Sequence, residues 1–145
     1  MLEKALILAA KAHTGQVDKG GAPYILHPIR VMLVCEGEKE KIVALLHDTL
    51  EDTALTAADL RRAGFSEEIV QAVCCLTRGQ KEDYMDYIAR ICENALAARV
   101  KYADLQDNLD ISRIPNPTEK DFARIRKYEQ AMKRITRSIK GGREH

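Results

Sequence analysis

Apolar side chains recur at three- and four-residue spacing along most of the chain, which is the pattern of one buried face of an α-helix. The first helix predicted in this way ends near His13-Thr14-Gly15 and carries on one face Leu2, Ala5, Leu6, Ala9 and Ala12. The segment from Thr14 to Tyr24 is rich in glycine and contains Pro23. We therefore expect a loop there, able to bring backbone amides close to a ligand.

Sequence signals for helix starts and stops divide the rest of the chain. His27-Pro28 opens a second, largely buried helix that Gly37 closes, since proline is favoured at or near the first helical position. A capping box at Thr56-Ala57-Ala58-Asp59 starts a brief helix that Gly64 stops. The next helix starts at Ser66-Glu67-Glu68 and carries on its core face Ile69, Val70, Ala72, Val73 and Leu76.

Three more helical patterns follow, and they cover 84–91, 94–109 and 118–140. Asn94 caps the second of them, and Gly141-Gly142 ends the third. No alternating run of strand length lies between the turn signals. The sequence therefore predicts an all-α single domain over residues 1–145, with 137–145 as the end of the last helix and a tail.

One of the predicted buried helices carries an unusual concentration of charge. The apolar run Ile42-Val43-Ala44-Leu45-Leu46 leads directly into His47-Asp48-Thr49-Leu50-Glu51-Asp52. On a helix that turns about 100° per residue, the four ionisable side chains of this stretch fall within a sector of roughly 140° and can face one cavity. Burying that much charge is costly unless a divalent cation compensates it. We interpret His47 and Asp48 as metal ligands, with Glu51 and Asp52 left to handle water and protons.

Composition and charge narrow the class of protein. The length of 145 residues and the mass of 16.3 kDa suit one hydrophobic core. A net charge of +1 gives no overall field for nucleic acid or a membrane surface, so small charged ligands are the expected partners. The four cysteines have no Cys-x-x-Cys spacing, and we expect reduced, structural thiols. We see neither a signal peptide nor a spanning segment, and we expect a cytoplasmic protein; the sequence does not address the oligomeric state.

Histidines and carboxylates from separate helices form a second, wider pattern. A lone histidine is more often a hydrogen-bonded or surface residue than a metal ligand. As a set, however, two neutral nitrogens and two hard oxygens come from three predicted helices, on His27, His47, Asp48 and Asp104. That mixture of ligands suits Mn²⁺, Fe²⁺ or Zn²⁺.

Several motifs follow one another in an order typical of a known family. They are Ala9–Gln16, Lys19, Pro23–Pro28, Leu45–Thr53 and Lys101–Leu109. In sequence and spacing they resemble the HD-domain metal-dependent phosphohydrolases, and within these the hydrolase domain of the RelA/SpoT homologues and the small alarmone hydrolases. The resemblance covers Leu2 to about Leu109. It implies a compact helical HD domain with a single metal site between helices.

The same resemblance implies roles for individual residues. It implies one Mn²⁺, or another divalent transition metal, held by His27, His47, Asp48 and Asp104. Glu51 and Asp52 would orient and deprotonate the attacking water, Lys19 and Asn108 would hold substrate phosphate and ribose, and Tyr24 would lie beside the nucleotide pocket. The implied reaction removes the 3′-pyrophosphate from guanosine tetra- or pentaphosphate. Because 145 residues leave no room for a synthetase half, we expect a stand-alone hydrolase.

Two positions depart from the family pattern. Asp18 stands where the family usually carries an arginine that packs against guanine, and Asp110 stands where another arginine is common. Two alternatives therefore stay open: the same metal chemistry on an adenine alarmone or another nucleotide phosphate, and a catalytically silent module that binds a nucleotide. The pair Glu51 and Asp52 argues against the silent module, because a binding site alone has no need of carboxylates that activate water.

Other aromatic side chains receive plainer interpretations. His13 matches a histidine that the family keeps, but the ligand set is complete without it, so we expect a structural or supporting role. We interpret Tyr84 and Tyr87 as core and rim packing.

Overall fold

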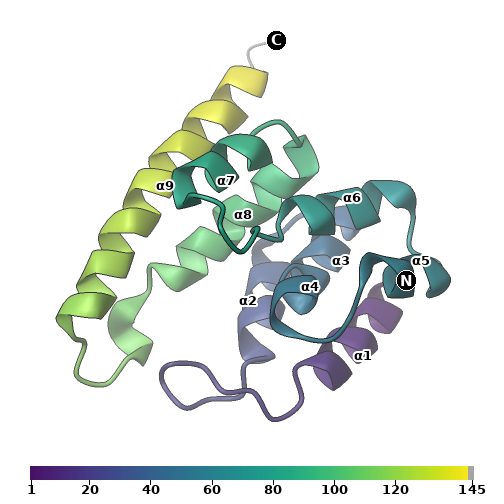
Figure 1. The fold of residues 1–145 in the computed structure, drawn as a ribbon, viewed down its shortest axis with the longest axis horizontal. Coiled ribbons are helices and arrows are strands. Elements are labelled where there is room, and N and C mark those ends of the chain that lie inside the picture. Colours follow the sequence, from purple (N-terminus) through teal and green to yellow (C-terminus); the bar gives the residue numbers. More distant parts are fainter. Residues whose placement is uncertain (144–145) are drawn as a thin grey trace.

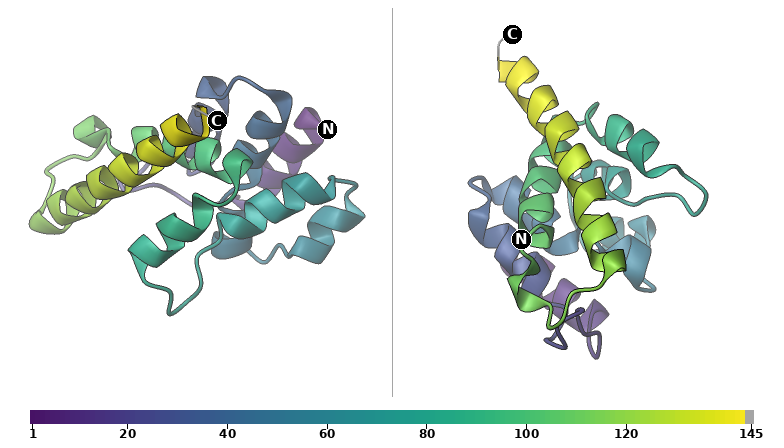
Figure 2. Two further views of the ribbon diagram at one scale, coloured as in Figure 1. Left: turned by 90° about the horizontal axis from the view of Figure 1, so that it is seen from above. Right: turned by 90° about the vertical axis from the view of Figure 1, so that its left-hand side faces the viewer.

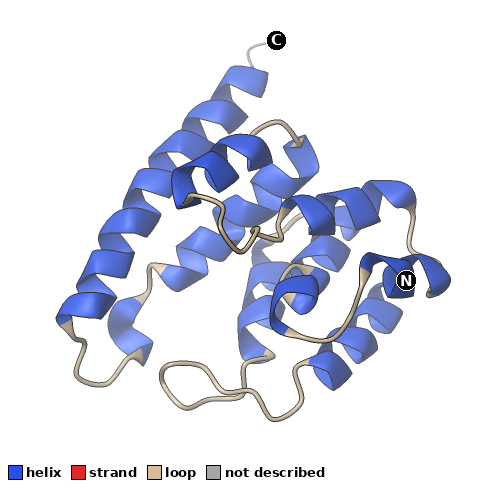
Figure 3. Cartoon of the chain, in the orientation of Figure 1, coloured by secondary structure: helices blue, strands red, loops and turns tan. Residues whose placement is uncertain are grey.

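A computed structural model of the chain describes residues 1–143, and every regular element in that range is a helix (Figures 1 and 3). The prediction of an all-α fold is confirmed. The helices are α1 (Leu2–Ala12), α2 (Leu26–Val34), α3 (Glu38–Leu46), α4 (Thr49–Asp52), α5 (Ala57–Arg62), α6 (Glu67–Cys75), α7 (Tyr84–Ile91), α8 (Ala95–Asn108), the 3₁₀ helix η1 (Ile111–Arg113) and α9 (Glu119–Arg143).

The centre of the fold is α3, whose last five residues, 42–46, are all buried. It contacts α1, α2, α6 and α8, so apolar side chains surround it on several sides. This explains why the run Ile42–Leu46 is apolar at every position rather than on one face. The side chains that follow this run are therefore delivered to the middle of the molecule.

Helix starts agree with the capping signals in the sequence. The Thr56 hydroxyl accepts the amide of Asp59, and the Asp59 carboxylate accepts the amide of Thr56, which completes the predicted capping box. Ser66 caps α6 and Asn94 caps α8 through their side-chain oxygens. Gly64, with a φ of +96°, ends the segment after α5 in a conformation that favours glycine.

One continuous helix through Asp52 was expected, and this expectation is wrong. The chain turns at His47 and Asp48 between α3 and the single-turn helix α4. The ring Nδ1 of His47 donates to the carbonyl of Ala44 (2.6 Å), and the Thr49 hydroxyl donates to the carbonyl of Leu46 (2.7 Å). These side chains take carbonyls at the end of α3 that a continuing helix would have used, which favours a break.

The long helix α9 runs beside α8 and also contacts α7 (Figures 1 and 2). Ala131 and Ile135 are fully buried on its inner face. The prediction that Gly141-Gly142 ends this helix is wrong, because α9 continues to Arg143. A glycine in the interior of a helix destabilises the helix by only about 1 kcal/mol relative to alanine. The preceding turns of α9 can offset this cost. Residues 144–145 lie outside the described part of the chain, and the single-domain bounds of 1–145 stay a prediction.

Two expectations from composition concern thiols and membranes. Cys35, Cys74, Cys75 and Cys92 are free thiols in the described structure, and Cys35 is buried. Within residues 1–143, no helix combines the length and the apolar character that a membrane crossing requires.

Candidate metal centre and its cavity

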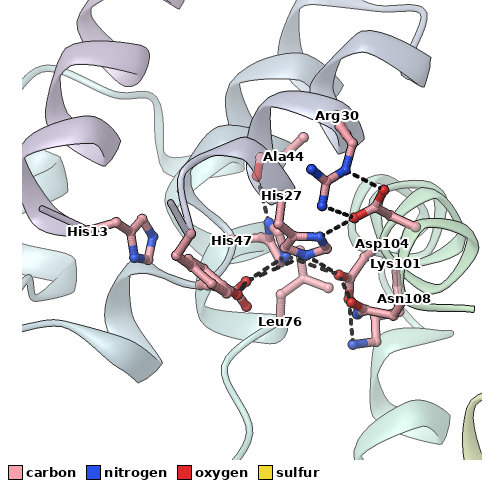
Figure 4. A network of polar contacts seen from close by, with 12 residues as sticks. His13, His27, Arg30, Ala44, His47, Leu76, Lys101, Asp104 and Asn108 are labelled. Carbon is pink, nitrogen blue, oxygen red and sulfur yellow. Dashed lines mark hydrogen bonds and ion pairs between the residues drawn. The ribbon is translucent and has the colours of Figure 1, made fainter. Parts of the chain in front are cut away.

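Three helices bring two histidines and one aspartate together at the centre of the molecule. His27 comes from the first turn of α2, His47 follows α3, and Asp104 lies on α8. The exposed fractions of these residues are 5%, 2% and 3%, respectively. One ligand atom from each lies within 4.8 Å of the others, a spacing that fits a metal ion (Figure 4). The structure thus brings together three of the four side chains predicted as ligands.

The fourth predicted ligand, Asp48, stands at the edge of this cluster. Its Oδ2 lies 3.0 Å from Nε2 of His47 and 3.8 Å from Nε2 of His27. The Tyr24 hydroxyl donates a hydrogen bond to the same oxygen. Burial would raise the pKa of Asp48, but the adjacent His47 outweighs burial and lowers that pKa to about 2. Asp48 is therefore a carboxylate turned toward both histidines.

The hydrogen bond that His47 makes through Nδ1 leaves its other ring nitrogen, Nε2, able to bind a cation. Because Nδ1 donates to the carbonyl of Ala44, Nε2 carries a free lone pair in the neutral ring. That nitrogen is buried and finds no hydrogen-bond partner among the described residues, although Oδ2 of Asp48 and Oδ1 of Asp104 lie 3.0 and 3.3 Å away. A buried, unpaired nitrogen that faces carboxylate oxygens fits a divalent metal.

The ring of His27 faces a carboxylate at each of its two nitrogens. Nδ1 lies 2.6 Å from Oδ2 of Asp107, and Nε2 lies 2.8 Å from Oδ1 of Asp104. Burial would lower the pKa of His27, but its contacts with these two carboxylates outweigh burial and raise it. The pKa of His47 is also raised, despite burial, by Asp48 and Asp104. The cluster thus attracts positive charge, which a bound cation would supply.

Lys101 completes the surroundings of Asp104 and was not predicted. Its ammonium donates to Oδ2 of Asp104 (2.8 Å), while Asn108 donates to Oδ1 (3.1 Å). Burial would raise the pKa of Asp104, but Lys101 and His47 hold it well below its usual range. Lysine within a helical pattern normally indicates an exposed position, so this buried partner could not be predicted from the sequence.

A cavity of about 510 Å³ opens beside the cluster, and Asp48, Glu51 and Asp52 line it. The carboxylate of Glu51 accepts the amide of Arg78 (2.7 Å), which ties α4 to the loop after α6. Burial, followed by the charges of Asp48 and Glu51, raises the pKa of Asp52 to about 6. The predicted proton-handling pair therefore faces the same space as the predicted ligand Asp48.

All three side chains predicted to contact substrate, Lys19, Tyr24 and Asn108, also line this cavity. The structure adds five basic side chains at its wall besides Lys101 and Lys19, namely Arg30, Arg78, Arg113, Arg124 and Lys127. Partial burial and repulsion from Arg78 and Arg124 lower the pKa of Lys127, so each of the two arginines lies close to Lys127. The part of the wall that these three cations form suits a negatively charged group of a ligand.

Tyr84 and Tyr87, which were interpreted as core and rim packing, differ in how deeply they are buried. Tyr87 is 4% exposed, and its hydroxyl donates to the carbonyl of Leu76 (2.6 Å). Tyr84 is only partly buried, and its ring lies under the cationic groups of Lys127 (4.5 Å) and Arg78 (5.3 Å). Tyr84 therefore belongs to the cationic part of the cavity wall.

His13 lies apart from the cluster, on the other side of it from Arg30 (Figure 4). Its ring is 5.0 Å from that of Tyr24, and Nδ1 is bonded to Gln16 (2.8 Å). Gln16 in turn donates to the backbone carbonyl of Asp52 (3.0 Å). These two hydrogen bonds through Gln16 link the loop after α1 to α4. A supporting role for His13 stays a prediction.

The two aspartates that depart from the family pattern both serve local structure. Oδ1 of Asp18 accepts the amides of Gly20 and Ala22 (both 2.9 Å) and so shapes the loop. A Cβ on Gly20 would lie 2.4 Å from the carbonyl oxygen of Arg113, so the loop is packed closely on η1. Asp110 caps η1 and accepts a bond from Arg113 (2.8 Å).

Comparisons with known proteins agree with this geometry. No family model matches the chain. A GTP pyrophosphokinase of Myxococcus xanthus is 29% identical over 127 residues, and a guanosine-3′,5′-bis(diphosphate) 3′-pyrophosphohydrolase of Aquifex aeolicus is 32% identical over 120 residues. These alignments cover 75% and 74% of this chain but only 17% of each relative. The chain thus spans about a sixth of the curated relatives it matches.

A solved structure extends the likeness to nearly the whole chain. It belongs to a metazoan ortholog of SpoT that hydrolyzes ppGpp, and it matches with a TM-score of 0.77 and 25% identity over 97% of this chain and 85% of that one. The chain is therefore similar to hydrolases of the SpoT/RelA family. The resemblance drawn from the motifs is therefore confirmed, and the similarity to a SpoT ortholog includes α9, beyond the last motif.

Proposed function

We propose that this chain is a metal-dependent hydrolase that removes the 3′-pyrophosphate from guanosine tetra- or pentaphosphate. The observation that carries the proposal is the buried pair His27 and His47 with Asp104, in which Nε2 of His47 lacks a hydrogen-bond partner among the described residues, beside a cavity lined with carboxylates and cations. The Aquifex relative is named for this reaction, and the metazoan ortholog hydrolyzes ppGpp.

The proposed ligands of the metal are His27, His47, Asp48 and Asp104. Two imidazole nitrogens and two carboxylates suit Mn²⁺, and other divalent transition metals would also be accepted. Bound there, the cation would lower the pKa of water and neutralise charge on the phosphoryl group. The buried Lys101 and the Asn108 amide keep Asp104 turned toward the histidines.

We assign proton handling to Glu51 and Asp52. Both line the cavity, and neither belongs to the histidine cluster. A carboxylate with a pKa of about 6, as at Asp52, is well matched to taking a proton from water near neutral pH. The amide of Arg78 holds the carboxylate of Glu51 in place, which suits orientation of the water.

Charge along the cavity supports a substrate with phosphates at two positions. Lys19 and Arg113 lie on or beside the loop that shapes one part of the wall, while Arg78 and Lys127 lie at the Tyr84 ring and Arg124 lies near Lys127. A nucleotide with phosphates on both the 3′ and 5′ oxygens could engage both groups, whereas a nucleoside monophosphate could engage only one. Tyr24 and Asn108 would contact the nucleoside between them.

The substrate is tested by incubating the purified chain with Mn²⁺ and a panel of nucleotides. The panel contains guanine and adenine nucleotides that carry a 3′-pyrophosphate, together with nucleoside monophosphates, and the products are separated by anion-exchange chromatography. We expect pyrophosphate release from the guanine compounds and none from the monophosphates. Preference for adenine would assign the alternative substrate, and the carboxylate at Asp18 would then be the first residue to examine. No turnover of any compound by metal-loaded protein would contradict the enzymatic proposal.

A further inference from the structure

Asp107 has more charged contacts than any role assigned above requires. It lies on α8, and its side chain is 11% exposed. Oδ2 is 2.6 Å from Nδ1 of His27 and accepts a bond from Nη2 of Arg30 (3.0 Å), while Oδ1 accepts a bond from Nε of Arg30 (2.8 Å). A second arginine, Arg113, also forms an ion pair with Asp107, with its Nη2 3.2 Å from Oδ1. One carboxylate thus joins a proposed metal ligand to two guanidinium groups.

The direction of the bond to His27 follows from these contacts. A carboxylate paired with two guanidinium groups is ionised and can only accept hydrogen bonds. Nδ1 of His27 therefore donates, and in the neutral ring the lone pair is on Nε2, the nitrogen that faces Asp104. His47 reaches the same state by donating to the neutral carbonyl of Ala44.

We propose that Asp107 is a positioning residue for the metal centre, which fixes the orientation and tautomer of His27 and makes its Nε2 a stronger ligand. Arg30 holds Asp107 in place through two bonds. This inference rests on the proposed function, because it assumes that His27 binds the metal. Carboxylates that accept the second N–H of a metal-bound histidine typically raise its basicity and strengthen metal binding.

Asp107 is not itself suited to bind the same ion. Its oxygen meets Nδ1, whereas the other cluster atoms meet Nε2, and these two nitrogens point away from each other on the imidazole ring. An ion pair with Arg30 alone would be a second possibility, in which the contact with His27 is incidental. The two readings differ in what removal of the charge at Asp107 does to metal affinity.

The test compares Asp107→Asn with the matched control Glu82→Gln. Asparagine keeps the size and one acceptor oxygen of the side chain but removes its charge. Glu82 is also bonded to an arginine through two contacts, with Arg90 (2.9 and 3.0 Å), but within residues 1–143 it forms no hydrogen bond or ion pair with a histidine. We measure the dissociation constant for Mn²⁺ by competition with a chelator in the absence of nucleotide, and thermal unfolding checks that each variant is folded.

We expect Asp107→Asn to bind Mn²⁺ about 10- to 100-fold more weakly than the wild type, and Glu82→Gln to bind it unchanged. Equal affinity in Asp107→Asn and the wild type would overturn the inference while leaving the proposed function intact. A wild type that binds no metal would overturn both.

A second measurement covers the case in which Asp107→Asn does not fold. In wild-type protein loaded with Zn²⁺, the Nδ1 proton of His27 should give a strongly deshielded, slowly exchanging NMR signal. Arg30→Gln, which loosens Asp107 without removing it, should shift that signal and speed its exchange. A wild-type ring that carries no proton on Nδ1, or a signal that Arg30→Gln leaves unmoved, would contradict the positioning role.

Discussion

Glu51→Gln is expected to bind metal as the wild type does and to lose about 10²- to 10⁴-fold in turnover, the usual contribution of a general base. Glu51 lines the cavity but stands outside the histidine cluster, so its neutral analogue leaves the ligands untouched. Glutamine also keeps an oxygen that can accept the amide of Arg78, which preserves the position of α4. The loss should appear in kcat, with little change in KM.

Asp48→Ala is the contrasting variant. It removes an oxygen that faces both histidines, and we expect it to lose both bound metal and activity. Metal content is measured by atomic emission after desalting, on the same samples that are assayed for turnover. If the two variants lose metal equally, the division between ligands and proton-handling residues is wrong.

Lys101→Met is expected to destabilise the metal-free protein by about 3–5 kcal/mol, the usual effect of removing one partner from a buried ion pair. Lys101 and Asp104 are 8% and 3% exposed, and their charged atoms are 2.8 Å apart. Without the ammonium, Oδ2 of Asp104 has lost the positive charge that it contacts. Divalent metal should recover part of the loss, because it binds the folded form and returns positive charge to Asp104.

Lys39→Met is the matched control, since Lys39 pairs with Glu68 at 2.7 Å on the surface, where the two side chains are 62% and 57% exposed. Surface pairs of this kind contribute about 0–1 kcal/mol. Both variants are unfolded with urea, with and without metal. A loss in Lys101→Met no larger than in Lys39→Met would show that Lys101 does not compensate a buried charge.

The sequence predicted helices well where side chains bond to their own backbone. Thr56, Ser66 and Asn94 start helices because their oxygens reach amides within the same turn, which is local chemistry. The turn at His47 and Asp48 is also local, but the apolar run before it continues the helical pattern and hides the break. The helical path through Gly141 was missed because glycine is a frequent, not an obligatory, helix stop.

The residues of the candidate site were predictable only in part. Motif spacing brought together His27, His47 and Asp104, which the structure holds within one cluster. The residues that bond to these side chains, Lys101 and Asp107, were not predictable, because in the sequence they resemble ordinary exposed charged residues of a helix. Lys101 bonds to Asp104 on the same helix, but its burial comes from the packing around α8. Asp107 contacts His27 and Arg30, which are far away in sequence, and the packing of α8 on α2 creates those contacts.

The most direct test of the central claim is a titration of Mn²⁺ into metal-free protein with guanosine tetraphosphate present. Bound metal and released pyrophosphate are measured on the same samples. The account predicts no release without metal, a rate that rises in proportion to the first bound equivalent, and saturation at one ion per chain. Release that is equally fast in the metal-free protein, or a fully loaded protein that releases no pyrophosphate, would contradict it.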